Sequence, residues 1–277
     1  MQREKKHAII LIIVLFFILN SCTTIATRTY DVKTALLEEQ SSITIVLLSD
    51  LHNSIFGIDQ SILIDKIRDA NPDIIALSGD IIDNTDKITG TLLLLQGISG
   101  IAPIFFVTGN HEYRTGQIQR IQEELESYGV VILSDTYVRV ETGNNTIIVA
   151  GINDPAKYRY ERPPYTLNEI METRFRELDE IPLFKVLIAH RPELIEIYKN
   201  YSFDLVLSGH THGGQVRLPF INGLYAPNQG MFPKYAGGIY RHEKLTLVVS
   251  RGLSISYPKV PRIFNPPELV IVVIEFN

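Results

Sequence analysis

Five short apolar runs, each rich in β-branched residues, are spread along the chain with room for helices between most of them. Runs of this length and composition are typical of strands buried on both faces of a sheet. They cover residues 43–48, 74–77, 104–107, 186–189 and 205–207. The pattern therefore predicts alternating strands and helices, as in α/β proteins.

The segments around these runs predict helices and paired strands. Helical apolar spacing, with Pro192 at one expected start and Gly129 at one expected end, indicates helices. They are expected over residues 58–70, 88–98, 118–128, 167–178 and 192–200. Alternating residues predict antiparallel strands over 130–133, 137–140 and 146–150, a hairpin turn at 143–145, and closing strands over 245–250 and 269–276.

A polar motif follows each of the five buried runs directly. Loops at the carboxyl ends of strands are where open α/β sheets bind ligands. Residues two apart in extended chain point to the same side, so the paired members of a motif can reach one centre. The motifs are Asp50-Leu51-His52, Gly79-Asp80, Gly109-Asn110-His111-Glu112, His190 and Gly209-His210-Thr211-His212. Together they predict a metal site at one rim of the fold.

Each motif has a simpler interpretation when it stands alone. A single His beside a strand is usually a hydrogen-bonded structural residue, and Gly-Asp is usually a turn. The set changes this, because five of the seven histidines lie in the motifs and only His7 and His242 do not. Imidazole and carboxylate ligands suit Zn, Mn or Fe. So many ligands fit two metals about 3.5–4 Å apart that share a carboxylate.

The ordered series of motifs resembles the calcineurin-like metallophosphoesterases. The run from Ser208 to Phe220, with segments 235–252 and 262–268, resembles a membrane-associated bacterial branch of that superfamily. The resemblance extends from about residue 43 to the C-terminus. It implies a four-layer αββα sandwich, in which two mixed β-sheets are flanked by helices.

The resemblance also implies a role for each residue. Two divalent metal ions would polarise phosphoryl oxygens and lower the pKa of the attacking water. Catalytic His111 would lie outside the coordination shell and stabilise the transition state or protonate the leaving oxygen. Asp50, His52 and His212 would hold one metal, Asn110, His190 and His210 the other, and Asp80 would bridge them.

Composition agrees with a single globular domain over residues 43–277. Hydrophobic residues make up 45% of the chain and charged residues 21%, which are ordinary values for a folded protein. The net charge of −5 supplies no general basic field, so nucleic acid is not an expected partner. Nothing in the sequence implies a protein partner, and the single cysteine excludes an intrachain disulfide.

The N-terminus predicts export and membrane attachment. Three basic residues within positions 3–6 precede an apolar run over 8–19, the pattern of a secretory signal. The run leads to Cys22, in a sequence that resembles a bacterial lipobox, so residues 1–22 would be a signal peptide with a lipidated cysteine. The alternative is an uncleaved anchor with an incidental cysteine. Both place the catalytic domain outside the cytoplasm, in the bacterial cell envelope.

Residues 23–42 are interpreted as a tether, with a short helix over 31–40. Two later segments, 154–164 and 217–240, carry arginines and aromatic residues respectively. The simpler interpretation is that both are surface segments packed on their own aromatics. In the sharper one, the first contacts phosphate and the second contacts an acyl chain or a membrane.

The sequence as a whole predicts a membrane-tethered, metal-dependent phosphoester hydrolase. We expect a phosphodiesterase or pyrophosphatase whose phosphoester substrate is lipid-linked or belongs to the cell envelope. One alternative is a hydrolase of soluble nucleotides or phosphomonoesters. Another, from a different class, is a non-catalytic phosphoesterase-like scaffold that binds a partner protein. Such scaffolds typically lose metal ligands, and none is missing here, although fold alone is no proof of function.

Overall fold

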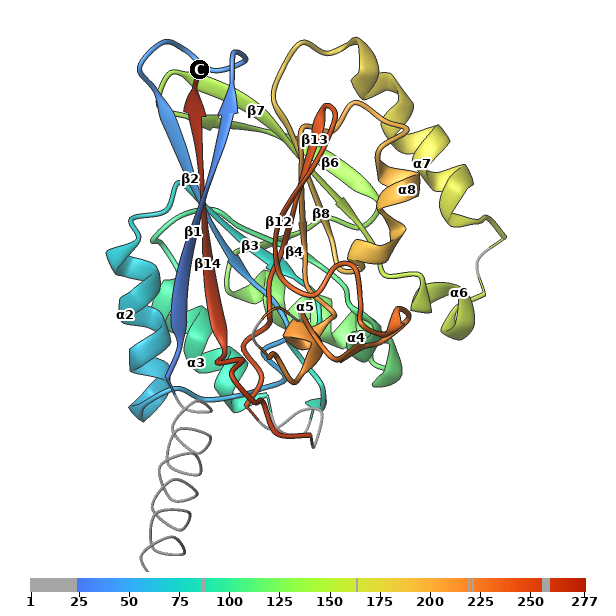
Figure 1. Cartoon of the computed structure of the whole chain (residues 1–277). Helices are drawn as coiled ribbons and strands as arrows, with labels where there is room; N and C mark the ends of the chain where they lie inside the picture. Colours follow the sequence, from blue (N-terminus) through green and yellow to red (C-terminus); the bar gives the residue numbers. More distant parts are fainter. Residues whose placement is uncertain (1–23, 86–87, 163, 219, 221, 256–259) are drawn as a thin grey trace, which may run out of the picture.

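A computed structural model describes residues 24–85, 88–162, 164–218, 220, 222–255 and 260–277. Two six-stranded sheets pack face to face and carry helices on their outer faces (Figure 1). The first sheet has the order β1 (Ala26–Thr34), β14 (Glu268–Phe276), β2 (Ser42–Leu48), β3 (Ile74–Ser78), β4 (Ile104–Val107), β5 (Val130–Ile132). The second has the order β12 (Gly238–His242), β13 (Leu245–Val249), β9 (Leu205–Ser208), β8 (Lys185–Ala189), β7 (Asn145–Ile152), β6 (Thr136–Thr142).

Three apolar layers hold the four structural layers together. Between the sheets, side chains such as Leu47 of β2 and Ile188 of β8 share one buried cluster. The outer face of the first sheet is covered by α2 (Ser61–Asp69), α3 (Thr89–Ile98) and α5 (Ile118–Ser127). The outer face of the second is covered by α7 (Leu167–Phe175) and α8 (Ile195–Tyr198). The expected αββα sandwich of two mixed sheets is confirmed.

The five apolar runs are β2, β3, β4, β8 and β9, all in the interior of the two sheets. In the first sheet, β2, β3 and β4 run parallel, and in the second, β7, β8, β9 and β13 do so. The strands have no exposed face, which explains their continuous apolar sequence. Their carboxyl ends therefore meet at one rim of the sandwich.

The tether expected over residues 23–42 is wrong for most of its length. Residues 26–34 form β1, an edge strand that pairs parallel with β14 along its whole length. Val32 of β1 and Leu37 beyond it are buried in the cluster between the sheets, which also excludes the expected helix over 31–40. The sequence does not predict this strand, because an edge strand with one buried side chain shows almost no alternation of apolar and polar residues.

The strand near residue 130 differs in direction from the expected one. It is expected to be antiparallel, but β5 pairs parallel with β4 in the first sheet. The hairpin of β6 and β7 is confirmed, with Gly143 in its turn. The residue pattern of a segment predicts that it is extended, but the strand with which it pairs depends on contacts between residues distant in sequence.

The expected signal peptide over residues 1–22, including Cys22, lies outside the described residues. Among the residues that the structure does describe, no helix has the length and apolar character required to cross a bilayer.

Candidate active site

The carboxyl ends of five interior strands bring the expected metal ligands together. Asp50 and His52 follow β2, Asp80 follows β3, and His190 follows β8. Side-chain atoms close enough to share an ion, within 4.8 Å of one another, form three buried groups. These groups are Asp50–His52–His212, Asp80–His190–His210 and His52–Asp80–His111. Because Asp80 belongs to two groups, its place agrees with a bridging carboxylate.

The first group joins the loops after β2 and β9. The Nε2 of His212 lies 3.5 Å from Oδ1 of Asp50, and the imidazoles of His52 and His212 are stacked with centroids 5.2 Å apart. The Nε2 of His52 lies 3.8 Å from Oδ2 of Asp80. Burial lowers the pKa of both histidines to about 3, so at neutral pH each ring is uncharged and retains a lone pair for a cation.

The second group is oriented by hydrogen bonds behind it. His190 donates from Nδ1 to the carbonyl of Ser78 at 2.7 Å, which directs its Nε2 at Oδ2 of Asp80, 3.2 Å away. His210 donates from Nε2 to Oδ1 of Asn228 at 2.8 Å, leaving its Nδ1 to face His190. Bonds of this kind fix the tautomer and orientation of metal-binding histidines.

The charge balance of the second group favours a bound cation. Burial lowers the pKa of His190, but the Asp80 carboxylate outweighs burial and raises it to about 10. Burial, together with the charges of His190 and Arg191, lowers the pKa of His210 to about 3. The space between Asp80, His190 and His210 thus attracts positive charge, which a proton or a metal ion can supply.

Asn110 completes the donor set from the start of α4 (Asn110–Arg114). Its Oδ1 is buried and has no hydrogen-bond partner within the described part of the structure. An unsatisfied buried carbonyl oxygen is unfavourable unless it meets a donor or a cation. With carboxylate, imidazole and amide donors gathered at one buried rim, the residues fit divalent metal ions.

The backbone of the site is strained where the ligands leave it. Five ligands have positive φ, a region that L residues adopt at a cost of about 1–3 kcal/mol each and that persists mainly at functional sites. They are Asp50, His52, Asp80, His210 and His212, with φ of 50°, 46°, 53°, 70° and 48°. The glycine before His210 is required by packing, because a Cβ on Gly209 would overlap the side chains of Ser49 and Asp50.

His111 sits beside the ligand groups but has its own partners. Its Nδ1 is in close contact with the Asp83 carboxylate, and its Nε2 lies 3.2 Å from Nη1 of Arg114. Burial lowers the pKa of His111, but the hydrogen bond to Asp83 outweighs burial and raises the pKa above its usual value. The Asp80 carboxylate acts in the same direction, so the two carboxylates favour the protonated form of His111.

Three further residues support the site and were not singled out in the sequence. Glu112, fully buried, accepts backbone N–H groups of Asp80, Ile81, Ile82 and Gly109 at 2.7–3.0 Å and so ties the loops after β3 and β4 together. In the sequence, Glu112 could have been noticed as the last residue of the motif that begins at Gly109. Asp83 carried a weaker signal, three residues after Asp80. Asn228 lies in the segment 217–240 considered above, but no motif marked the residue itself.

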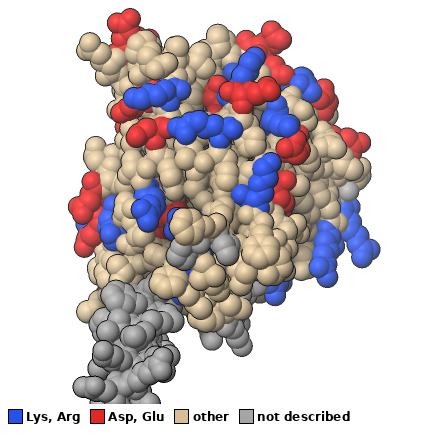
Figure 2. Space-filling model, in the orientation of Figure 1, with Lys and Arg blue, Asp and Glu red and all other residues tan. Residues whose placement is uncertain are grey.

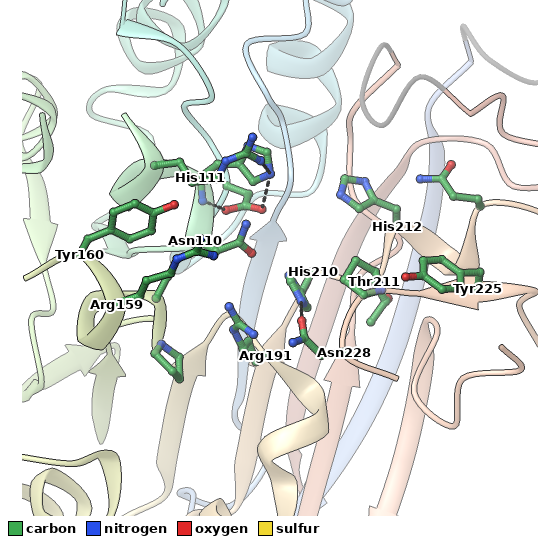
Figure 3. A pocket seen from close by; sticks show the side chains of 16 residues that line it. Asn110, His111, Arg159, Tyr160, Arg191, His210, Thr211, His212, Tyr225 and Asn228 are labelled. Atoms are coloured by element: carbon green, nitrogen blue, oxygen red, sulfur yellow. Dashed lines mark hydrogen bonds and ion pairs between the residues drawn. The ribbon is translucent and has the colours of Figure 1, made fainter. Parts of the chain in front are cut away.

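A cleft of about 500 Å³ opens onto these residues and is lined by both segments that were considered for specificity. Arg159 and Tyr160, from α6 (Ala156–Tyr160), stand on one side, and Tyr225 stands on the other (Figure 3). Arg191 also faces the cleft, held by two hydrogen bonds to Asp154 of 2.7 and 2.9 Å. Guanidinium groups fixed beside a metal-ligand cluster suit a phosphate ester.

Residues 43–214 match the family model for the calcineurin-like phosphoesterases. The match begins in β2 and includes all five motifs of the site. The chain belongs to this family. It is accordingly a metal-dependent phosphoester hydrolase.

Relatives of this phosphoesterase are similar over most of their length. Metallophosphoesterase YkoQ of Bacillus subtilis is 28% identical over 239 residues, which are 84% of this chain and 84% of the relative. Phosphodiesterase YaeI of Escherichia coli is 28% identical over 220 residues, 77% of this chain and 76% of the relative. Metallophosphoesterase Cj0846 of Campylobacter jejuni is 30% identical over 290 residues, 98% and 72% of the two chains.

Solved structures support the fold of the phosphoesterase. The sulfate thiohydrolase SoxB of Thermus thermophilus superposes with a TM-score of 0.52 at 13% identity, covering 78% of this chain and 53% of that one. The NAD nucleotidase of Haemophilus influenzae gives a TM-score of 0.53 at 13% identity, covering 78% and 46%. At this identity the likeness concerns the architecture.

Proposed function

We propose that this phosphoesterase uses two divalent metal ions to hydrolyse a phosphodiester or pyrophosphate of a lipid or cell-envelope molecule, outside the cytoplasm. The observation that carries the reaction is the cluster of buried ligand groups at the floor of an arginine-lined cleft, in which Oδ2 of Asp80 lies 3.2 Å from His190 and 3.8 Å from His52. The substrate class is supported by the expected export signal and by similarity to a protein named as a phosphodiesterase.

One metal would be held by Asp50, His52 and His212, and the other by Asn110, His190 and His210, with Asp80 between them. Bound divalent cations of Mn, Fe or Zn would supply Lewis acidity and lower the pKa of an attacking water. Retention of every ligand argues for catalysis over the alternative of a protein-binding scaffold.

The chain's own residues would bind the ester and manage its charge. Arg191 and Arg159 face the cleft and would bind the non-bridging phosphate oxygens. His111, held by Asp83 and with a raised pKa, would donate a proton to the leaving oxygen. His52, His210 and His212 are neutral at pH 7, and each would use a ring lone pair to coordinate a metal.

A substrate screen tests the proposal. The purified full chain is stripped with a chelator, reloaded with Mn, Fe or Zn, and assayed on bis(p-nitrophenyl) phosphate, p-nitrophenyl phosphate and a polyprenyl pyrophosphate. We expect activity that returns with metal and is higher on the diester or pyrophosphate than on the monoester. Preference for the monoester or for free nucleotides would replace the proposed substrate class with the soluble alternative, and inactivity with every loaded metal would favour a scaffold.

A further inference from the structure

Most of the large apolar side chains that the described structure exposes come from three loops at one end of the sandwich. The loops follow β2, β9 and β13, and all lie at the lower end of Figure 1. We call this surface the apolar rim. It consists of Ile55 and Ile58 in the first loop with Ile62 in the first turn of α2 directly after it, Leu218, Phe220, Tyr225, Met231 and Phe232 in the second loop, and Ile255, Val260 and Phe264 in the third.

Hydrogen bonds connect the three loops to one another. The N–H of Ile255 donates to Oγ of Ser54 at 3.2 Å, connecting the third loop to the first. The N–H of Arg217 donates to the carbonyl of Ile263 at 2.9 Å, connecting the second loop to the third. Contiguous exposed apolar surface of this kind marks a site of contact with a protein or a membrane.

The apolar rim borders the catalytic cleft. Tyr225 is 53% exposed on the rim and also lines the cleft. Asn265, which follows Phe264, is buried and donates from its side chain to the carbonyl of the expected metal ligand His212 at 2.7 Å. Whatever covers the rim therefore lies at the mouth of the active site.

The phenylalanines of the rim are not explained by packing within the chain. Phe232 and Phe264 are 63% and 57% exposed, and Phe220 is fully exposed. All three have positive φ, at 56°, 51° and 68°. A bulky residue in this region strains the backbone, so both the exposure and the conformation oppose stability and point to an external contact.

The start of the described chain lies at the same end. The N–H of Ala26 donates to the carbonyl of Pro267 at 2.8 Å, close after the third loop. The apolar run of the N-terminus ends at Leu19, and the seven residues from there to Ala26 span at most about 25 Å. A membrane that holds residues 8–19 would therefore lie within reach of the rim. In Figure 2 the lower centre of the described surface carries few charged side chains, whereas basic side chains lie to its right and side chains of both signs gather over the upper part.

We propose that the apolar rim docks on the surface of a phospholipid bilayer, with Phe232 and Phe264 inserted among the lipids and the cleft mouth at the interface. A phosphoester headgroup could then enter the cleft from the membrane without leaving it. The proposal deepens the proposed function, on which its last step rests. The docking itself depends only on the rim and the N-terminus.

The absence of tryptophan from the chain allows a direct test. Phe232→Trp places a single fluorophore on the rim, and Leu36→Trp places one at the opposite end of the sandwich, where Leu36 is 42% exposed. Each full-length variant is reconstituted into phosphatidylglycerol–phosphatidylethanolamine vesicles with and without brominated acyl chains. We expect at least a twofold loss of emission from Trp at 232 and no loss at 36. Equal quenching at both positions, or none at 232, overturns docking.

A second copy of the chain is the competing occupant of the rim. Chemical cross-linking of the same vesicles at low protein-to-lipid ratio distinguishes it. Monomers with quenched emission from position 232 support the bilayer. Cross-linked dimers in which that emission is blue-shifted but unquenched overturn docking in favour of self-association.

Activity measurements on soluble and vesicle-bound substrates distinguish the docking proposal from the proposed substrate class. Phe232→Ser combined with Phe264→Ser removes two inserted rings, and Leu36→Ser is the matched control. On water-soluble bis(p-nitrophenyl) phosphate all variants should equal the wild type. On a phosphoester lipid in vesicles the double variant should lose at least about tenfold, which corresponds to about 1.4 kcal/mol of lost burial over the two rings. An unchanged rate on the vesicle lipid overturns docking. If the wild type hydrolyses no vesicle lipid but position 232 is quenched, docking holds and only the proposed substrate class fails.

Discussion

At the residue scale, the Asp80 carboxylate connects the candidate metal ligands with His111. Asp80 faces His190 with Oδ2 and accepts the backbone N–H of His111 with Oδ1 at 2.8 Å. His190 outweighs the raising effect of burial and holds the pKa of Asp80 well below its usual value, so the carboxylate is ionised. The same side chain would thus supply negative charge to both proposed metal positions, and it holds the backbone of the histidine proposed as the general acid.

Asp80→Asn should therefore be the most damaging ligand substitution. The amide keeps the shape but removes the charge shared by both positions. We expect lower metal content at both positions by elemental analysis and activity near background, whereas His212→Asn should deplete one position. A variant that binds two metals per chain and turns over normally would contradict the bridging role.

His111→Ala should affect rate far more than metal content. General acid catalysis contributes about 10²–10⁴-fold, so turnover should fall by about that factor on esters with poor leaving groups. The defect should shrink for leaving groups of low pKa, which need little protonation. Kinetics across a leaving-group series and metal analysis measure both. Since His111 also lies within ligand distance of His52 and Asp80, loss of metal would make it a ligand instead.

Asp83→Asn should change the pH dependence through His111. The Asp83 carboxylate raises the pKa of His111, and an acid is active only while protonated, below its pKa. Removing the carboxylate lowers that pKa, so the alkaline limb of kcat/KM should move to lower pH while metal content stays unchanged. Asp65→Asn, at an exposed carboxylate on α2, is the control. An unmoved alkaline limb would assign Asp83 a purely structural role.

The gathering of the candidate ligands could be predicted from sequence because each follows a strand whose apolar run is easy to identify. The supporting residues could not, because their partners are fixed only by the fold. Glu112 reaches four backbone N–H groups across two loops, and Asn228 reaches His210 from a loop with no strand pattern. A polar motif directly after a strand can be recognised from neighbouring residues in the sequence. The hydrogen bonds that orient the ligands come from loops that are distant in sequence and meet only in the folded protein.

At the element scale, β1 shows where local pattern fails. The strand is polar on most positions and lies at a sheet edge, so its one fully buried side chain, Val32, leaves no periodicity to detect. Interior strands such as β3 are buried at every position and were located within a residue. Burial on both faces is thus what made five strands predictable, and pairing with β14 is what makes β1 a strand.

Val32→Ala should test whether β1 is part of the folded domain. Deleting two buried methyl groups between the sheets should lower the free energy of unfolding by about 1–3 kcal/mol. Thr29→Ala, at an exposed position of the same strand, should change it by less than about 0.5 kcal/mol. Urea unfolding of both variants gives the comparison. Equal stability of Val32→Ala and the wild type would return residues 26–34 to the role of a tether.

At the scale of the whole molecule, the short distance between the N-terminal run and β1 sets how freely the enzyme can move. With residues 26–34 in the sheet, only residues 20–25 separate the apolar run from the folded domain. The domain is thereby confined close to whatever holds the N-terminus, with the cleft and the apolar rim at the same end. A long tether would allow the folded domain any orientation relative to its attachment point, whereas a short tether favours a single orientation.

The nature of that attachment is the last prediction. If Cys22 is lipidated, the mature protein begins four residues before β1, and a lipid held there places the sheet edge within about 14 Å of its attachment point. Mass spectrometry of the mature N-terminus should show a diacylated or triacylated Cys22, and Cys22→Ser should abolish acylation and lipoprotein-type processing. Ser21→Ala, one residue earlier, is the matched control and should be processed normally. An intact Met1 on the wild type would favour an uncleaved anchor. A free, unmodified terminus elsewhere would favour simple secretion, and then the apolar rim alone would have to hold the enzyme at a membrane.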